Sequence, residues 1–246
     1  MTFMARIFIT GSADGLGQAT AQTLLAEGHQ VVVHVRAPQR LVAVQNLIDR
    51  GAEAAVGDLA DFDQTRDIAE QVNELGPMDA IILNAGVYSG PTVLPVNVVA
   101  PYIITALTVR PQRLIFLSSS MHRNGRPSLA GMDWTGQRVT GSYSDSKLFV
   151  TALAAGVARL WPDVFCNSVD PGWVPTRMGG PNAPDDLRLG HLTQEWLATS
   201  DDVEAQTTNG YWHHQQKADP HPAARDINFQ IHLLDQLARA TGLSLA

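Results

Sequence analysis

The sequence contains a single cysteine, Cys166, so no disulfide bond can form within the chain. It also has few cations: 17 Lys and Arg residues against 24 Asp and Glu residues give a net charge of −7 at pH 7. This charge argues against a nucleic-acid partner and against an anionic membrane surface, both of which require clustered Lys and Arg side chains. Long apolar runs such as residues 97–109 are too short to span a bilayer, and this one contains Pro101.

Repeats and low-complexity linkers are absent as well, so we expect a single domain over residues 1–246. The first apolar run begins at residue 6, and we expect no signal peptide before it. Cys166 lies in the apolar segment 164–169, which predicts a packed thiol rather than a nucleophile. A chain of this kind suits a reducing compartment, and we expect a cytoplasmic protein.

What the sequence does contain is a regular alternation of short β-branched runs and amphipathic segments. The predicted strands are residues 6–10, 30–35, 52–57, 79–84, 113–118 and 164–169, with a weaker one at 210–214. The predicted helices are residues 15–27, 39–50, 62–75, 95–108, 142–160, 185–200 and 223–241. Such alternation indicates parallel strands joined by right-handed crossovers. The predicted fold class is α/β: a single doubly wound Rossmann-fold domain with a parallel sheet of about seven strands, which binds ligands at the strands' carboxyl ends.

The segment TGSADGLG, residues 10–17, follows the first predicted strand and leads into the first helix. Gly11, Gly15 and Gly17 can adopt positive φ angles and let a backbone approach a ligand closely. The helix that follows presents unpaired N–H groups and a positive dipole end, which together favour a phosphate. The spacing is G-x-x-x-G-x-G, and the alternative interpretation is a tight structural turn.

Asp14 places a negative charge inside this loop. One interpretation is that Asp14 caps the first helix by accepting a backbone N–H, with its carboxylate turned away from the phosphates. The other is that it lies near the adenine ribose and affects the choice of cofactor. The two interpretations are compatible, and the sequence leaves both open.

Tyr143 and Lys147 lie four residues apart in the predicted helix 142–160, so they share one face. An ammonium near a tyrosine favours the phenolate and lowers the pKa of that tyrosine, which then acts as an acid or base near neutral pH. Taken alone, the same pattern is also typical of a Tyr–Lys pair on the surface of an amphipathic helix.

Seven motifs occur in order along the chain: TGSADGLG, GDLAD, LNAG, VNVVAPY, LIFLSSSMH, YSDSK and DPGWVPT. With them the chain resembles the short-chain dehydrogenase/reductase family. The sequences of the LSSSMH and YSDSKL motifs are most similar to those of the retinol-dehydrogenase-like members and of relatives of protochlorophyllide reductase. The resemblance implies a nicotinamide dinucleotide cofactor and reversible hydride transfer between an alcohol and a carbonyl.

The resemblance also implies roles for individual residues. The family's catalytic residues correspond to Asn97, Ser119, Tyr143 and Lys147. Ser119 would orient the substrate oxygen, Tyr143 would exchange a proton with it, and Lys147 would lower the pKa of Tyr143. Asn97 would hold a water beside Lys147. The residues expected to bind the cofactor are Gly11, Ser12, Asp14, Gly15, Leu16, Gly17, Arg36, Asp58, Leu59, Asn84, Ala85, Gly86, Tyr143, Lys147, Pro171, Gly172, Val174 and Thr176.

Arg36 follows the second predicted strand directly, with Arg40 one helical turn further on and no acid at the strand end. In a dinucleotide fold an acid there binds the ribose 2′-hydroxyl of NAD, whereas an arginine accommodates the 2′-phosphate of NADP. The sequence therefore predicts that NADP(H) is preferred and that NAD(H) is possible. Asp14 would weaken the preference if its carboxylate faced the same phosphate.

Two segments depart from the family pattern. Asn84, Asn97 and Ser119 lie closer together in the sequence than is common, so we expect a shortened fourth helix and either a monomer or an atypical homodimer. The longer segment 121–141, which precedes Tyr143, is expected to form a flap over the substrate pocket.

The candidate substrate-pocket residues are large and mostly apolar: Tyr88, Met121, Trp134, Trp173 and Met178. We therefore expect a small-molecule, largely apolar carbonyl or alcohol as substrate. His213, His214 and His221 belong to a polar end strand and loop, which predicts solvated side chains and no metal. The alternative to an oxidoreductase is a catalytically silent sensor or scaffold that binds the dinucleotide. The four residues of catalytic type favour the enzyme, because a sensor needs no proton transfer.

Overall fold

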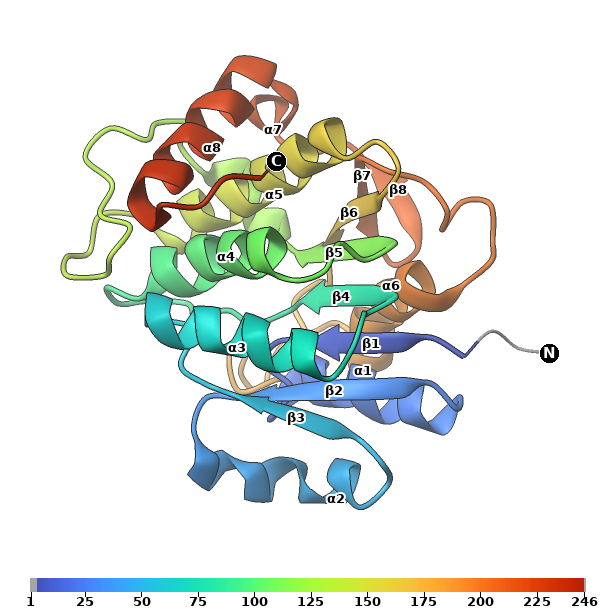
Figure 1. Ribbon diagram of the computed structural model, residues 1–246. Coiled ribbons are helices and arrows are strands. Elements are labelled where there is room, and N and C mark those ends of the chain that lie inside the picture. The colour runs from blue at the N-terminus through green and yellow to red at the C-terminus, as the bar shows by residue number, and fades with distance from the viewer. Residues whose placement is uncertain (1–3, 246) are drawn as a thin grey trace.

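The strands form one eight-stranded sheet in the computed structural model, which describes residues 4–245. Their bounds are β1 (Arg6–Ile9), β2 (Gln30–Val35), β3 (Glu53–Val56), β4 (Ala80–Leu83), β5 (Arg113–Leu117), β6 (Phe165–Asp170), β7 (Gly210–His213) and β8 (Gln216–Ala218). Their order across the sheet is β3-β2-β1-β4-β5-β6-β7-β8 (Figure 1). The chain runs outward from β1 to β3 and then returns to β4 beside β1. The topological switch point, where such folds bind ligands, therefore lies between β1 and β4.

The first seven strands are parallel, as the sequence predicts. β4 and β5 are buried at every residue, because helices cover both faces of the sheet. The weak strand predicted at 210–214 is confirmed as β7, paired with β6. β8, a three-residue polar strand that pairs antiparallel with β7, was not predicted from the sequence. Its turn places His214 and Gln215 at positive φ, without the Gly or Asn that usually mark such a turn.

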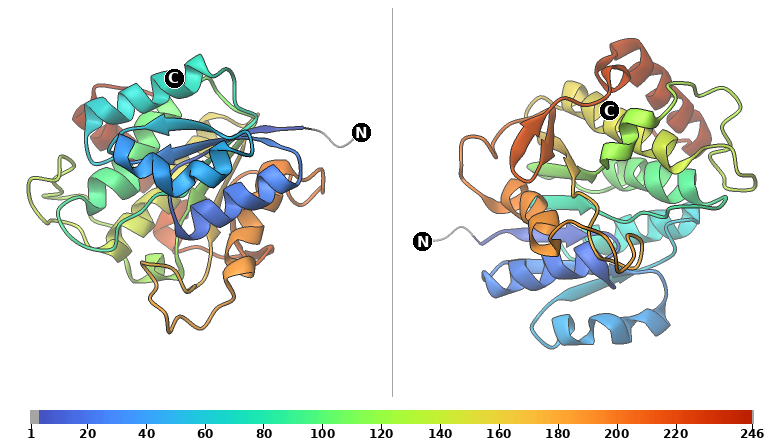
Figure 2. Two further views of the ribbon diagram at one scale, coloured as in Figure 1. Left: turned by 90° about the horizontal axis from the view of Figure 1, so that it is seen from below. Right: turned by 180° about the vertical axis from the view of Figure 1, so that it is seen from behind.

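Helices cover both faces of the sheet (Figure 2). Their bounds are α1 (Gly15–Ala26), α2 (Gln45–Ile48), α3 (Phe62–Glu74), α4 (Ala100–Leu107), α5 (Tyr143–Leu160), α6 (Leu187–Thr199), α7 (Pro222–Arg225) and α8 (Ile227–Thr241), with 3-10 helices η1 (Pro38–Val44) and η3 (Ser120–Asn124) and a π-helix η2 (Pro95–Val99). α1, α2 and α6 share one apolar core with the sheet, whereas α3, α4, α5 and α8 share the other. Within residues 4–245, no helix combines the length and apolarity that crossing a lipid bilayer requires.

Three predicted helices differ from the observed ones. The helix predicted over 39–50 is the 3-10 helix η1 followed by the single turn α2. The apolar residues Leu41, Val44 and Leu47 recur every third position there, which suits the three residues per turn of a 3-10 helix. The helix predicted over 95–108 begins with the π-helix η2, where the Ala100 N–H bonds to the Pro95 carbonyl.

The helix predicted over 223–241 is broken into α7 and α8. Asp226 stands between them in an extended conformation, and its side chain accepts the N–H of Asn228 at the start of α8. An aspartate is a good N-cap, so a second helix starts where the sequence analysis expected an uninterrupted one.

The helix α8 packs along the outer side of α5 (Figure 1). Every residue from Ser144 to Ala158 in α5 is buried. The helices approach closely at Gly156, where a Cβ would lie 3.2 Å from a side-chain carbon of Leu234. α5 is therefore covered by its own chain. The neighbouring helix α4 has only eight residues.

Candidate active site

The glycine loop between β1 and α1 forms an open cradle. Gly11 and Gly15 have φ angles of 68° and 56°, which residues with a Cβ rarely adopt. A Cβ at Gly17 would lie 2.5 Å from the Gly11 carbonyl oxygen, so a larger residue does not fit there. Ser12 is buried; its hydroxyl donates to the Ile9 carbonyl and accepts the His34 N–H. Ser12 thus shapes the loop through its side chain rather than presenting that side chain to a ligand.

Asp14 occupies the N-cap position of α1, but its side chain accepts no hydrogen bond from the helix. The capping interpretation is therefore wrong. Its carboxylate instead faces Arg40, with Asp14 Oδ2 at 3.6 Å from Arg40 Nη2. The orientation leaves the N–H groups of the first turn without a side-chain acceptor, as an anion-binding helix end requires.

A cavity of about 440 Å³ opens beside this cradle, within the usual size range of ligand sites. Many of the residues expected to bind the cofactor line it: Gly11, Asp14, Arg36, Asp58, Leu59, Ala85 and Gly86. Three further cations or imidazoles also line it: His34, Arg40 and Arg177. The missing side chains at the glycines, the free helix end and the bordering arginines all fit a dinucleotide with its phosphates.

Other predicted cofactor residues surround the cavity and hold its walls. Asn84 donates its amide N–H groups to the carbonyls of Thr10 (2.8 Å) and Gly11 (3.3 Å), fixing the cradle to the end of β4. The segment after β6 reaches the cradle through Thr176, whose side chain would contact a Cβ at Gly15 at 3.3 Å. In the same segment Val174 is buried, and Gly172, which follows Pro171, has a φ of 81°.

Leu16, in the first turn of α1, packs toward Gly190 on α6.

Tyr143 and Lys147 lie on the first turns of α5. The helix starts at Tyr143 because Ser142 and Asp145 form a capping box in which each side chain bonds the other residue's backbone N–H. Lys147 is buried, with its Nζ 5.5 Å from the centre of the Tyr143 ring. The same ammonium donates a 2.7 Å hydrogen bond to the Leu117 carbonyl at the end of β5.

Ser119 lies just beyond β5 and is brought to Tyr143, as the sequence analysis expected. Burial raises the pKa of Tyr143 to about 12, while the hydrogen bond with Ser119 acts in the opposite direction. Burial also lowers the pKa of Lys147 to about 8. The expectation of a lowered Tyr143 pKa is therefore wrong, because desolvation of the phenolate outweighs the effects that favour it.

Asn97 uses its side-chain amide to hold the loop after β4. Its Oδ1 accepts the Val87 N–H at 2.8 Å, and its Nδ2 donates to the Val87 carbonyl and to Ser146 Oγ, both at 2.9 Å. A Cβ at Gly86 would lie 3.5 Å from Asn97 Oδ1 and 3.6 Å from Lys147 Nζ. Asn97 thus ties this loop to α5 within reach of Lys147.

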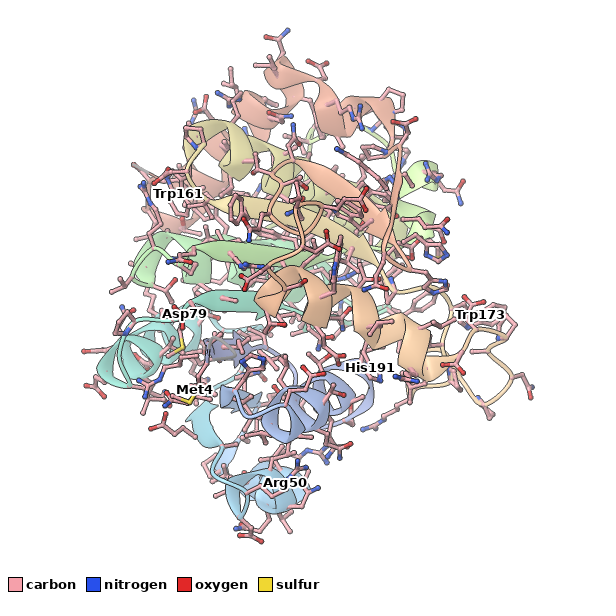
Figure 3. The ribbon with its side chains drawn as sticks, turned by 90° about the vertical axis from the view of Figure 1, so that its right-hand side faces the viewer. Met4, Arg50, Asp79, Trp161, Trp173 and His191 are labelled. Atoms are coloured by element: carbon pink, nitrogen blue, oxygen red, sulfur yellow. The ribbon has the colours of Figure 1, made fainter. Side chains whose placement is uncertain are left out.

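The mouth of the site is rimmed by exposed apolar side chains. Tyr88 is 55% exposed and its ring lies against that of Tyr143, with the centroids 4.9 Å apart. Trp173 is 59% exposed and projects from the loop before α6 (Figure 3), where its indole N–H donates to the Gly179 carbonyl. Met178, on the same loop, is also exposed. Their role in lining a substrate pocket stays a prediction.

Trp134 does not line this pocket, contrary to the sequence analysis. Its ring is buried 6.0 Å from that of Phe149 on α5, so it belongs to the core. The segment 121–141 expected to form a flap begins as η3 and is anchored by two buried residues, Leu129 and Trp134. An apolar core contact, rather than a free hinge, therefore holds the middle of this segment.

Two buried polar residues beside the site were not singled out by the sequence analysis. His122 Nε2 accepts the His221 N–H at 2.8 Å, so the proton is on Nδ1, which donates to the Ser119 carbonyl at 2.7 Å. His122 therefore supports the backbone of Ser119. Asp170 ends β6 and is 5% exposed. The only signal for either residue was its position, next to LSSS and inside VDPG.

The expectation that His213, His214 and His221 are solvated is wrong in part. His213 and His214 stack with ring centroids 3.9 Å apart, and His214 Nε2 is buried without a hydrogen-bond partner. His221 caps α7 by accepting the Ala223 N–H. Across residues 4–245 no group of three or more His, Cys, Asp or Glu side chains is arranged to hold a metal ion. The prediction of a packed Cys166 is confirmed, since its thiol is buried.

Comparison with known proteins gives a consistent result. A family model described as short chain dehydrogenase matches residues 5–110. The short-chain dehydrogenase chry4 of Gibberella zeae is 34% identical over 257 residues, covering 98% of this chain and 99% of that protein. Such identity over nearly the whole of both chains extends the match well beyond the dinucleotide-binding half.

Two solved structures share the fold. A crystal structure of a protein from Mycobacterium paratuberculosis superposes with a TM-score of 0.82 at 22% identity, covering 100% of this chain and 96% of that one. A blue fluorescent protein from a metagenomic library, in complex with NADPH, gives a TM-score of 0.69 at 24% identity, covering 85% and 95%. With the fold, the assembled site and the full-length relative in agreement, the chain belongs to the short-chain dehydrogenase/reductase family of oxidoreductases.

Proposed function

We propose that this oxidoreductase reduces a largely apolar ketone or aldehyde with NADP(H), using Tyr143 as the acid. The observation that carries the proposal is the grouping of Ser119, Tyr143 and Lys147. Lys147 in turn lies beside Gly86, which lines the cavity. The bound nicotinamide would supply the hydride. The protein supplies the proton, the positioning and the electrostatics.

Each residue has a role that its contacts support. Ser119 hydrogen-bonds the Tyr143 hydroxyl, so a substrate oxygen that enters between them meets two O–H groups. Tyr143 then gives its proton to that oxygen. The Lys147 ammonium, near the ring of Tyr143, stabilises the phenolate that remains. Asn97 keeps the loop that carries Tyr88 in place through its bonds to Val87.

The pKa of Tyr143 bears on the direction of the reaction. A phenol with a pKa of about 12 keeps its proton at neutral pH. It is therefore ready to act as an acid, whereas alcohol oxidation would first need the phenolate. At neutral pH the resting enzyme therefore holds Tyr143 in the protonated form that carbonyl reduction uses.

The preference for NADP(H) rests on the adenosine end of the cavity. Arg36 and Arg40 both line it, and a guanidinium can hold a phosphate through two parallel hydrogen bonds. Asp14 already pairs with Arg40, which reduces the positive charge available to a 2′-phosphate and leaves NAD(H) usable. The blue fluorescent protein of the same fold was solved in complex with NADPH, which supports this choice.

The decisive test is Tyr143→Phe, assayed by NADPH consumption on a ketone that the wild type reduces. Loss of the transferable proton should lower turnover by about 10²–10⁴-fold. Binding of NADPH, followed by fluorescence, should be retained. Tyr102→Phe is the matched control, because it removes a buried hydroxyl that bonds the Leu243 carbonyl far from the site. Wild-type turnover by Tyr143→Phe would rule out this proton donor.

A further inference from the structure

Asp170 is a buried carboxylate that no step of the proposed reaction uses. It ends β6, next to β5, with Val169 paired to Leu117. The Leu117 carbonyl is the acceptor of the Lys147 ammonium. Asp170, one residue beyond Val169, therefore ends its strand beside the place where the buried ammonium is held.

Few donors face this buried carboxylate: one backbone N–H and the hydroxyl of Tyr211, whose pKa is raised by burial and by the carboxylate. Asp170 Oδ1 accepts the Gly172 N–H at 3.1 Å. Its Oδ2 lies 3.7 Å from His213 Nδ1, and that nitrogen is nearer, at 3.1 Å, to the Asp170 carbonyl oxygen. A buried carboxylate with so few donors is costly unless a cation is close by.

The titratable groups around Asp170 come from three neighbouring elements. α5 contributes Tyr143 and Lys147, η3 contributes His122, and β7 contributes Tyr211 and His213. His122 is neutral, because its Nε2 accepts a backbone N–H and burial lowers its pKa. Arg123 lies 5.7 Å from the Tyr211 ring, on the outer side of this group. Lys147 is thus the buried ammonium of the cluster.

We infer that Asp170 is the counter-ion of Lys147 and keeps the lysine charged inside the protein. Burial lowers the pKa of Lys147 to about 8, and the negative charge of Asp170 opposes that change. Asp170 is a positioning residue in this account, because it acts on the reaction only through Lys147 and Tyr143.

The consequence for catalysis rests on the proposed function. When Tyr143 passes its proton to the carbonyl oxygen, its O–H bond breaks, the substrate O–H bond forms and a phenolate remains. That phenolate needs a charged Lys147. Without Asp170, Lys147 and Tyr143 would both lose their protons at lower pH, because removing a negative charge lowers the pKa of every neighbouring acid.

The electrostatic pairing can be tested without any substrate. Lys147 and Lys217 are the two lysines of the chain, so protein labelled with ¹³C-lysine gives two side-chain signals to follow against pH. The variant is Asp170→Asn, which keeps an oxygen for the Gly172 N–H and removes the charge. We expect the Lys147 titration midpoint to fall by about one pH unit or more. The exposed Lys217 provides the internal reference, and an unchanged Lys147 midpoint would overturn the inference.

Two further variants serve as the control and as the replacement for Asp170→Asn. Asp79→Asn is the matched control: Asp79 also accepts a backbone N–H, from Arg6 at 2.7 Å, but at the start of β4 rather than at the site. It should leave the Lys147 midpoint unchanged. Asp170→Ser serves if Asp170→Asn does not fold by circular dichroism, and it should lower the midpoint in the same way.

The activity measurement separates this inference from the proposed function. On a ketone that the wild type reduces, Asp170→Asn should move the alkaline limb of kcat to lower pH by the shift seen for Lys147. A lower rate with an unmoved limb would mean that Asp170 is only structural. If no ketone is reduced, the proposed function fails, while the lysine titration still decides the role of Asp170.

Discussion

The two ends of the proposed cofactor site are built on different physical principles. At the adenosine end, the charged pair is exposed: the side chains of Arg40 and Asp14 are 44% and 57% accessible to solvent. At the catalytic end, Lys147 and Asp170 are 4% and 5% exposed. Charges in water interact weakly and are screened by salt, whereas buried charges interact strongly. Cofactor choice should therefore be easy to adjust, whereas the proton-transfer end should tolerate little change.

The pH dependence of turnover should show the largest effect. Lys147 is charged below its pKa of about 8 and loses its proton as the pH rises through that value. Tyr143, with a pKa of about 12, keeps its proton throughout. We therefore expect kcat for carbonyl reduction to be highest below pH 8 and to fall above it, by up to about tenfold per pH unit.

The control for this profile is Lys147→Met, an unbranched apolar replacement that leaves no buried charge. It should lower turnover at every pH and abolish the limb near pH 8. A wild-type rate that stays flat to pH 10 would show that the buried end does not depend on the charge of Lys147.

A smaller effect is expected at the exposed end. Arg36→Ala should raise KM for NADPH by about tenfold, because one charge-assisted contact to the 2′-phosphate is lost. KM for NADH and kcat with either cofactor should change little. Steady-state kinetics at two salt concentrations would check this, since an exposed contact weakens as salt rises.

Asp14→Asn should change KM for NADPH in the direction opposite to Arg36→Ala. It releases Arg40 from its ion pair and should lower KM for NADPH several-fold. If the wild type preferred NADH and Arg36→Ala left that preference intact, this end of the cavity would not recognise a 2′-phosphate.

The smallest effect on catalysis is expected on α8, although the effect on stability is large there. Leu233 is fully buried in the core that includes α5. Leu233→Ala should lower the free energy of unfolding by about 2–5 kcal/mol, measured with urea, and leave kcat per folded molecule unchanged. Because α8 covers α5, we also expect light scattering to find the wild type as a monomer. A dimer that buries α5 would contradict this.

The sequence predicts the glycine loop and the start of α5 well, because the signals for both are local. The loop has a left-handed backbone at Gly11 and Gly15, which favours glycine there. Tyr143 and Lys147 share a face of their helix because they are four residues apart. The register of parallel strands then brings residues from different strand ends together. Ser119 follows β5 and meets Tyr143 because α5, which begins at Tyr143, packs against β5 and η3.

The rest depends on contacts that no local pattern records. The direction of the Asp14 carboxylate follows from the position of Arg40, and the raised pKa of Tyr143 follows from its burial. Trp134 is as apolar as Trp173, yet one packs on Phe149 and the other faces solvent. The break at Asp226 was readable in principle, since an aspartate followed by an amphipathic segment is a common helix start.

The covering of α5 by α8 also has a consequence for how the protein is made. A chain is synthesised from its N-terminus, and its parts begin to fold in that order. α5 leaves the ribosome well before α8, so its apolar outer side stays uncovered while β6, α6, β7 and α7 are still being added. During that interval the nascent chain exposes the apolar face of α5. We therefore expect incomplete chains to aggregate, or to depend on chaperones, most strongly at this stage.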